Sequence, residues 1–149
     1  MRFTTQLEVS CQHLEQALKL YFEGSAFYSA LTLAGAAEEL LARYVAEHNA
    51  TSAFDSLQAG SIRLATILRG DGTSPTPKEI ATVMNHARNV AKHQRPDSDL
   101  NYDPRVAARD MLDRCVTNYY TVMSFEEVPE TDLVRRFLHE DMQAAIEDE

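Results

Sequence analysis

The residues that decide the fold are AFYSALTLAGAAEELLARYVAE, positions 26–47. Most of them are strong helix formers. Five apolar side chains are spaced for one buried helix face: Phe27, Leu31, Ala34, Leu41 and Tyr44. Small residues also recur along the stretch, and they let the backbone of a neighbouring helix approach closely. The stretch therefore predicts the central packing helix of a helical bundle.

Helical spacing continues on both sides of this stretch. A preceding helix is predicted by an apolar stripe at steps of three and four, made by Leu7, Cys11, Leu14, Leu18 and Tyr21. Further helices are predicted over about residues 56–68, from Thr76 towards His93, from Asp103 onward and after Pro129. No segment alternates as a strand would. The sequence therefore predicts one all-α domain over residues 1–149, an antiparallel up-down bundle of four long helices with one or two short ones.

The charge of the chain limits what it can bind. The 149 residues are 44% apolar and 25% charged, which is ordinary for one globular domain. The net charge of −9 argues against a surface that coats nucleic acid or an anionic membrane. The charge is unevenly distributed, because residues 57–95 carry a local net of +4 and residues 124–149 carry −7. This distribution allows a small phosphate site in the basic middle, which we expect the acidic C-terminal segment to screen.

Several common kinds of site are not predicted. None of the five histidines follows a glutamate at the spacing of di-metal bundle sites, and Gly70 and Gly72 do not precede the Lys-Ser or Lys-Thr of a phosphate-binding loop. We therefore expect no metal and no cofactor. No apolar run approaches the ~20 residues of a membrane span. Because the only two cysteines, Cys11 and Cys115, do not suggest a disulfide framework, a cytoplasmic location is expected.

Residues 86–95, HARNVAKHQR, concentrate the side chains that can carry chemistry. Asn89 and His93 are four residues apart and share a helix face, whereas Arg88 is rotated away from His93 on an ideal helix. An imidazole can take the proton from a ribose 2′-hydroxyl or protonate the leaving 5′-oxygen. A guanidinium can bind a phosphate and stabilise the charge that grows on its oxygens. The segment therefore indicates metal-free cleavage of RNA.

Arg88-Asn89-Val90-Ala91-Lys92-His93 is an intact Arg-Asn-x-x-x-His motif. Together with the helical pattern it resembles the HEPN (higher eukaryotes and prokaryotes nucleotide-binding) superfamily of helical-bundle proteins. ALTLAGAAEELL, residues 30–41, is similar to the helix that precedes the motif helix in bacterial members. The resemblance implies a homodimer in which two copies of the motif form one metal-independent endoribonuclease site. It also implies that Arg88 binds phosphate, that Asn89 assists and that His93 is the acid/base group.

The resemblance extends to neighbouring residues and to partners. Lys92, Arg95 and His86 are candidate RNA contacts, and Glu38 or Glu39 corresponds to the polar residue that members place near the site. Many members are toxins that occur beside a small nucleotidyltransferase antitoxin. Members that this enzyme modifies carry a tyrosine two positions after the histidine, where this chain has Arg95. Nucleotidylation at that position is therefore not expected.

Plainer interpretations of the same residues stay open. His86 is then an exposed helix residue, Lys92 and Arg95 are cations that suit the end of a helix, and Glu38 and Glu39 are a solvated pair or the partner of an arginine such as Arg88. The matching alternative function is a noncatalytic helical module that binds a protein, a nucleotide or RNA.

Overall fold

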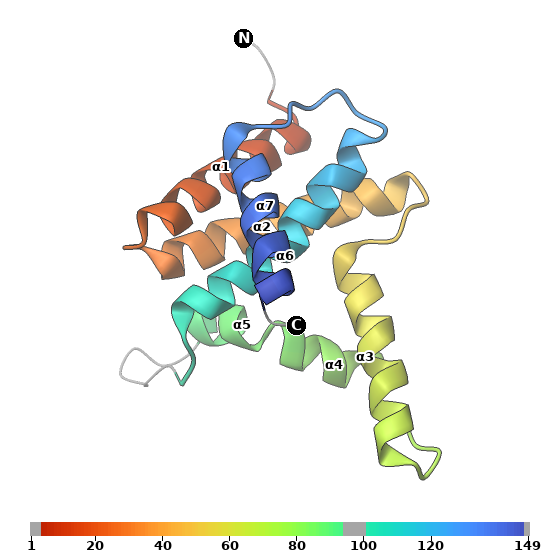
Figure 1. The fold of residues 1–149 in the computed structure, drawn as a ribbon. Helices are drawn as coiled ribbons and strands as arrows, with labels where there is room; N and C mark the ends of the chain where they lie inside the picture. The colour runs from red at the N-terminus through yellow and green to blue at the C-terminus, as the bar shows by residue number, and fades with distance from the viewer. Residues whose placement is uncertain (1–3, 94–100, 148–149) are drawn as a thin grey trace.

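The computed structural model describes residues 4–93 and 101–147, and every regular element within these ranges is a helix. The helices are α1 (Gln6–Glu23), α2 (Phe27–Glu47), α3 (Ala53–Arg69), α4 (Pro77–Met84), α5 (His86–His93), α6 (Pro104–Met123) and α7 (Asp132–Glu147), shown in Figure 1. The all-α prediction is therefore confirmed. Five of these helices have 16–21 residues, rather than the four long helices expected.

The helix boundaries follow local signals in the sequence. Thr76 begins α4 with a capping box, in which its hydroxyl accepts a hydrogen bond from the Glu79 backbone N–H while the Glu79 carboxylate accepts one from the Thr76 backbone N–H. Asp103 is the N-cap residue of α6. Its carboxylate accepts a hydrogen bond from the Arg105 backbone N–H, and Pro104 follows as the first residue of the helix. Gly24 ends α1 with φ 76°, in the left-handed region that glycine adopts without strain.

One predicted helix is divided in two. The helix expected from Thr76 towards His93 is interrupted at Asn85, which separates α4 from α5. The backbone of Asn85 has φ −100° and ψ 6°, outside the helical range, and its side-chain oxygen accepts hydrogen bonds from Arg114 on α6. A tertiary contact therefore coincides with the break, and helical periodicity alone did not reveal it.

The core forms where α2 packs between α1 and α6. The small face of α2 is fully buried at Ala30, Ala34 and Ala37, which allows the close approach that the sequence predicted. Large side chains of α1 and α6 are also fully buried in this core. They are Leu14, Leu18, Leu112, Tyr119 and Val122. Helix α7 covers this unit through Val134 and Phe137. The described part of the acidic C-terminal segment therefore packs on the core through the first turns of α7.

Helix α3 stands apart from the core. It leaves the body of the molecule and projects beyond it, with α4 beside it (Figure 1). Ala53, at its first turn, is the one residue of α3 that is buried. None of the described helices combines the length and the apolar character that a membrane span requires. Cys11 and Cys115 are both free thiols.

Candidate functional site

The motif lies on α5, a helix of eight residues. Asn89 and Lys92 are exposed on it, and Arg88 is half-buried. His93 is the last residue of α5, but its side chain lies outside the described part of the structure, as does Arg95 altogether. The structure thus brings Arg88, Asn89 and Lys92 together on one short helix, and it leaves the distance between Arg88 and His93 undetermined.

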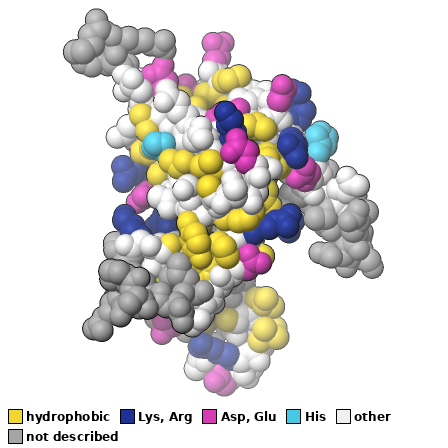
Figure 2. Space-filling view, turned by 90° about the vertical axis from the view of Figure 1, so that its left-hand side faces the viewer, with side chains coloured by type: hydrophobic (Ala, Val, Ile, Leu, Met, Phe, Trp, Pro, Cys, Tyr) yellow, Lys and Arg dark blue, Asp and Glu magenta, His cyan; other side chains and the backbone are white. Residues whose placement is uncertain are grey.

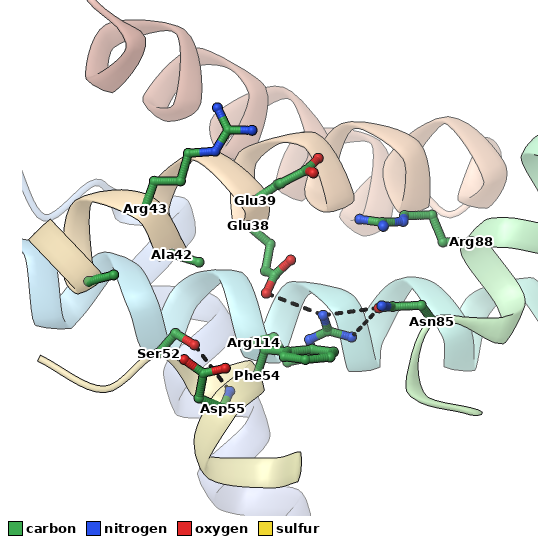
Figure 3. Close-up of a pocket in the computed structure, with 11 residues that line it drawn as sticks. Glu38, Glu39, Ala42, Arg43, Ser52, Phe54, Asp55, Asn85, Arg88 and Arg114 are labelled. Atoms are coloured by element: carbon green, nitrogen blue, oxygen red, sulfur yellow. Dashed lines mark hydrogen bonds and ion pairs between the residues drawn. The ribbon is translucent and has the colours of Figure 1, made fainter. Parts of the chain in front are cut away.

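Arg88 lies against α2 at a glycine. A Cβ atom added at Gly35 would come within 2.7 Å of Arg88 Cδ and 3.6 Å of Arg88 Nη1. Any larger residue at this position would therefore push the arginine aside. Gly35 belongs to the small-residue stretch of α2. Because it has no side chain, the motif helix α5 can pack closely against α2, as the core helices do. Figure 3 shows the Arg88 side chain extended along α2 towards Glu38 and Glu39.

Beside this contact is a cleft of about 330 Å³, which we call the α2 cleft. Six charged residues line it: Glu38, Glu39, Arg43, Asp55, Arg88 and Arg114. They come from α2, α3, α5 and α6, so the cleft lies where the projecting helices join the core. Three carboxylates and three guanidinium groups balance one another. The α2 cleft is therefore not a strongly cationic pocket, although Arg43 and Arg88, which are not buried, can donate hydrogen bonds to a phosphate oxygen.

The buried part of the α2 cleft is an ion pair that the sequence did not predict. Arg114 Nη2 lies 3.2 Å from Glu38 Oε1, and the side chains are only 7% and 6% exposed. Arg114 also donates to Asn85 Oδ1 from both Nη atoms at 3.2 Å, and its guanidinium lies 4.8 Å from the centre of the Phe54 ring. One side chain of α6 thus contacts α2, α3 and the junction between α4 and α5 (Figure 3).

The ion pair with Arg114 distinguishes between the interpretations that the sequence left open for Glu38 and Glu39. Glu38 is buried and pairs with Arg114, so among the described residues the arginine that holds it is on α6 and is not Arg88. Glu39 is exposed at the edge of the α2 cleft. The signal that the sequence did offer for Arg114 was its position on α6 between Met111, Leu112 and Cys115, all of which are buried. A single arginine on an apolar face needs a buried partner.

A second and larger cleft, of about 560 Å³, is also lined by Arg88 and Arg114, and we call it the α6 cleft. Its apolar lining includes Leu57, Val83 and Val106, which are themselves partly exposed. Its polar lining includes His86 and Arg88 from α5 and three aspartates of the α6 region, Asp103, Asp110 and Asp113. The exposed His86 is therefore beside Arg88 in space as well as in sequence.

Nearby tyrosines complete the surroundings of the α6 cleft. The Tyr102 ring lines the cleft and contacts the Tyr28 ring edge-on, with centroids 6.3 Å apart. Its buried hydroxyl has no hydrogen-bond partner among the described residues, and burial raises its pKa. Tyr102 therefore stays a neutral hydrogen-bond donor beside the cleft throughout the physiological pH range.

Neither a group of metal ligands among the described residues nor a similar known protein indicates a function for this chain. Within residues 4–93 and 101–147, no three His, Cys, Asp or Glu side chains are grouped as metal ligands would be. No protein-family model, no curated protein and no solved structure matches the chain. The geometry around Arg88 is therefore the structural basis for a functional proposal.

Proposed function

We propose that this protein is a metal-independent endoribonuclease of the HEPN type, acting through a composite site in a homodimer. The observation that carries the proposal is the contact between Arg88 and Gly35. The two stretches that resemble the superfamily, residues 30–41 and residues 88–93, are more than forty positions apart in the chain, yet they touch at these two residues. Because Gly35 has no side chain, Arg88 lies close against α2, and this contact supports the proposal by fixing where the motif arginine stands relative to the stretch 30–41.

The proposed reaction uses the 2′-hydroxyl of the RNA itself. His93 removes the proton from this hydroxyl, its oxygen attacks the adjacent phosphorus, and the bond from phosphorus to the 5′-oxygen breaks. An imidazolium, supplied by His93 of either copy, returns a proton to that leaving oxygen. Arg88 binds the phosphate and stabilises the charge on its oxygens, and Asn89 donates a hydrogen bond beside it. The products are a 2′,3′-cyclic phosphate and a 5′-hydroxyl.

The remaining predicted residues have supporting roles in this proposal. Lys92 and Arg95 contact the RNA backbone, and His86 does so from the start of α5. The Glu38 carboxylate pairs with the Arg114 guanidinium, which in turn donates a hydrogen bond to Asn85, the residue just before α5. The exposed Glu39 lines the α2 cleft.

The helical body of this proposal consists of α1, α2, α6 and α7, with the motif helix packed on α2. The expected antiparallel up-down order does not hold for α2 and α6, which run in the same direction, because Tyr28 contacts Tyr102 near their starts and His48 contacts Phe125 near their ends.

The protein acts beside a protein partner in this proposal. The resemblance implies a toxin-like ribonuclease with an antitoxin-like protein partner. The two free cysteines support a reducing, cytoplasmic location. Regulation by nucleotidylation of a tyrosine beside the motif is not part of the proposal, because Arg95 occupies that position.

Cleavage of RNA in the presence of EDTA tests the proposal. We expect the His93→Ala variant to fold and dimerise as the wild type does and to lose cleavage. The matched control is His139→Ala, which removes an exposed imidazole from α7, far along the chain from the motif. Cleavage that His93→Ala leaves unchanged would refute the proposal.

The second candidate function is a noncatalytic helical module that binds a protein, a nucleotide or RNA. It is favoured by the exposed apolar side chains along α3, because such surfaces commonly mark interaction sites. The two candidates differ in what Arg88→Ala does. Loss of cleavage is expected for the ribonuclease, whereas a module that binds through α3 keeps its partner when Arg88 is removed.

A further inference from the structure

Four charged side chains around the α2 cleft have no partner among the described residues. Glu39, Arg43, Asp55 and Arg88 line the cleft, and none of them makes a hydrogen bond or an ion pair with the described part of the chain. Three of them are exposed and Arg88 is half-buried. The buried ion pair of the same cleft, by contrast, is already satisfied. Two carboxylates and two guanidinium groups are therefore available to a ligand.

Three of these groups follow one another along α2. Gly35, which Arg88 contacts, Glu39 and Arg43 are spaced by four residues, so each step is about 6 Å along the helix axis and turns by only about 40°. Figure 3 shows Arg43, Glu39 and Arg88 in this order along α2. Ala42 lines the cleft beside them with no more than a methyl group. The row is therefore a polar edge with free space next to it.

A bare polyanion is a poor match for this set of groups. Carboxylates only accept hydrogen bonds, whereas guanidinium groups only donate them, and the cleft presents both. Figure 2 shows the same mixture on a larger scale, because Lys and Arg side chains are interspersed with Asp and Glu side chains on the face that it displays. The cleft therefore suits a ligand that offers donors and acceptors side by side, as the edge of a nucleobase does.

We propose that the α2 cleft binds a guanine base of single-stranded RNA, next to the phosphate that Arg88 binds. The inference rests on the proposed function and names the nucleotide that its site selects. Guanine presents adjacent N–H donors at N1 and N2, which match the two oxygens of the Glu39 carboxylate. The neighbouring O6 and N7 atoms accept two hydrogen bonds from one guanidinium, which Arg43 supplies. Arg88, at the other end of the row, stays available for the phosphate.

The other three RNA bases do not present this pattern to Glu39. Adenine and cytosine each have a ring nitrogen that accepts hydrogen bonds beside their amino group, and uracil has a single N–H between two carbonyl oxygens. Each of them would therefore place a lone pair against a carboxylate oxygen, where no hydrogen bond can form. A site built to bind polar hydrogens strongly rejects a ligand that lacks them. Glu39 is thus the specificity-determining residue of this proposal.

The lining also offers apolar contact to the faces of the base. Phe54, the second residue of α3, is half-buried and lines the cleft together with Ala42 and Ala46 of α2. Unstacked RNA bases bind on aromatic rings and guanidinium planes. The volume of about 330 Å³ is at the small end of the ~300–1,000 Å³ of ligand sites. The cleft therefore has room for a base rather than for a longer stretch of RNA.

Binding of short oligonucleotides tests the selection without requiring cleavage. The probes are fluorescein-labelled 2′-fluoro pentanucleotides, which lack the nucleophilic hydroxyl and differ only in a central guanine, hypoxanthine or adenine. Fluorescence anisotropy with the full chain gives each Kd. We expect the guanine probe to bind about tenfold or more tightly than the hypoxanthine probe, which lacks the N2 amino group, and the adenine probe to bind more weakly still. Equal Kd values for guanine and adenine, or no binding of any probe, would overturn the proposal.

Two variants test the roles of the side chains. Glu39→Gln keeps the shape of an exposed side chain but replaces an acceptor with an amide donor, so it should abolish the preference for guanine over adenine. Arg43→Gln should weaken the guanine and hypoxanthine probes alike, because both bases present O6 and N7. Glu47→Gln is the matched control, since it changes an exposed carboxylate of α2 outside the cleft. A preference for guanine that Glu39→Gln leaves intact would overturn the proposal.

Competition with 5′-GMP separates RNA from a free nucleotide as the source of the guanine. We expect the pentanucleotide to bind more tightly, because the exposed Lys92 contacts a further phosphate in the proposed function. Tighter binding of 5′-GMP would overturn the assignment to RNA. The proposed function fails separately: cleavage that His93→Ala leaves unchanged would refute the ribonuclease mechanism alone, whereas cleavage with no preference for guanine in binding would refute this inference alone.

Discussion

The buried ion pair of the α2 cleft gives the sharpest prediction about stability. Arg114→Met removes the guanidinium while keeping a side chain of similar length, and it leaves the carboxylate of Glu38 buried without its partner. Removing one member of a buried ion pair costs about 3–5 kcal/mol, a large fraction of the ~5–15 kcal/mol that stabilise a typical domain. The hydrogen bonds to Asn85 and the contact with Phe54 are lost with it. A chain of this size should then melt roughly 6–20 °C lower.

The assay is urea unfolding followed by far-ultraviolet circular dichroism. Arg135→Met is the matched control, because Arg135 pairs with Glu130 on the surface, where side-chain exposures are 51% and 35%, and such pairs contribute about 0–1 kcal/mol. The double variant Arg114→Met, Glu38→Leu should recover most of the loss, since it replaces the pair with apolar side chains. If Arg114→Met costs no more than Arg135→Met does, the ion pair does not anchor the helices around it.

Two further predictions concern single residues. Gly35→Ala should leave the free energy of unfolding within about 1 kcal/mol of the wild type, because alanine favours a helix and the clash falls on a flexible side chain, yet it should reduce RNA cleavage as Arg88→Ala does. Cleavage at the wild-type rate would show that the position of Arg88 is unimportant. Burial raises the pKa of both thiols, and most strongly that of Cys115, so at pH 8 iodoacetamide should modify Cys11 slowly and Cys115 only after unfolding. Rapid labelling of Cys115 in the folded protein, measured by mass spectrometry, would contradict the packing around α6.

Local features of the sequence predicted most of the helices. The small and apolar residues of α2 predicted its burial, and the capping residues Thr76 and Asp103 predicted where α4 and α6 begin. These signals depend on neighbours within a few positions. The break at Asn85 was missed because it coincides with a contact to Arg114, which is 29 positions away in the chain.

The candidate site was predictable only in part, for the same reason. The motif identified Arg88, Asn89 and His93, but periodicity does not say which residue lies opposite an arginine. Its contact with Gly35 and the pairing of Glu38 with Arg114 depend on how α2, α5 and α6 pack. The uncovered face of α3 was missed because an apolar stripe on a helix predicts burial without saying which molecule buries it.

The most direct test of the account is the chemistry of the RNA ends produced in EDTA. If the 2′-hydroxyl is the nucleophile, mass spectrometry of fragments made by the wild type should find 2′,3′-cyclic phosphate and 5′-hydroxyl ends, and His93→Ala should yield no fragments. Fragments with 3′-hydroxyl and 5′-phosphate ends, or the same fragments from His93→Ala, would contradict it.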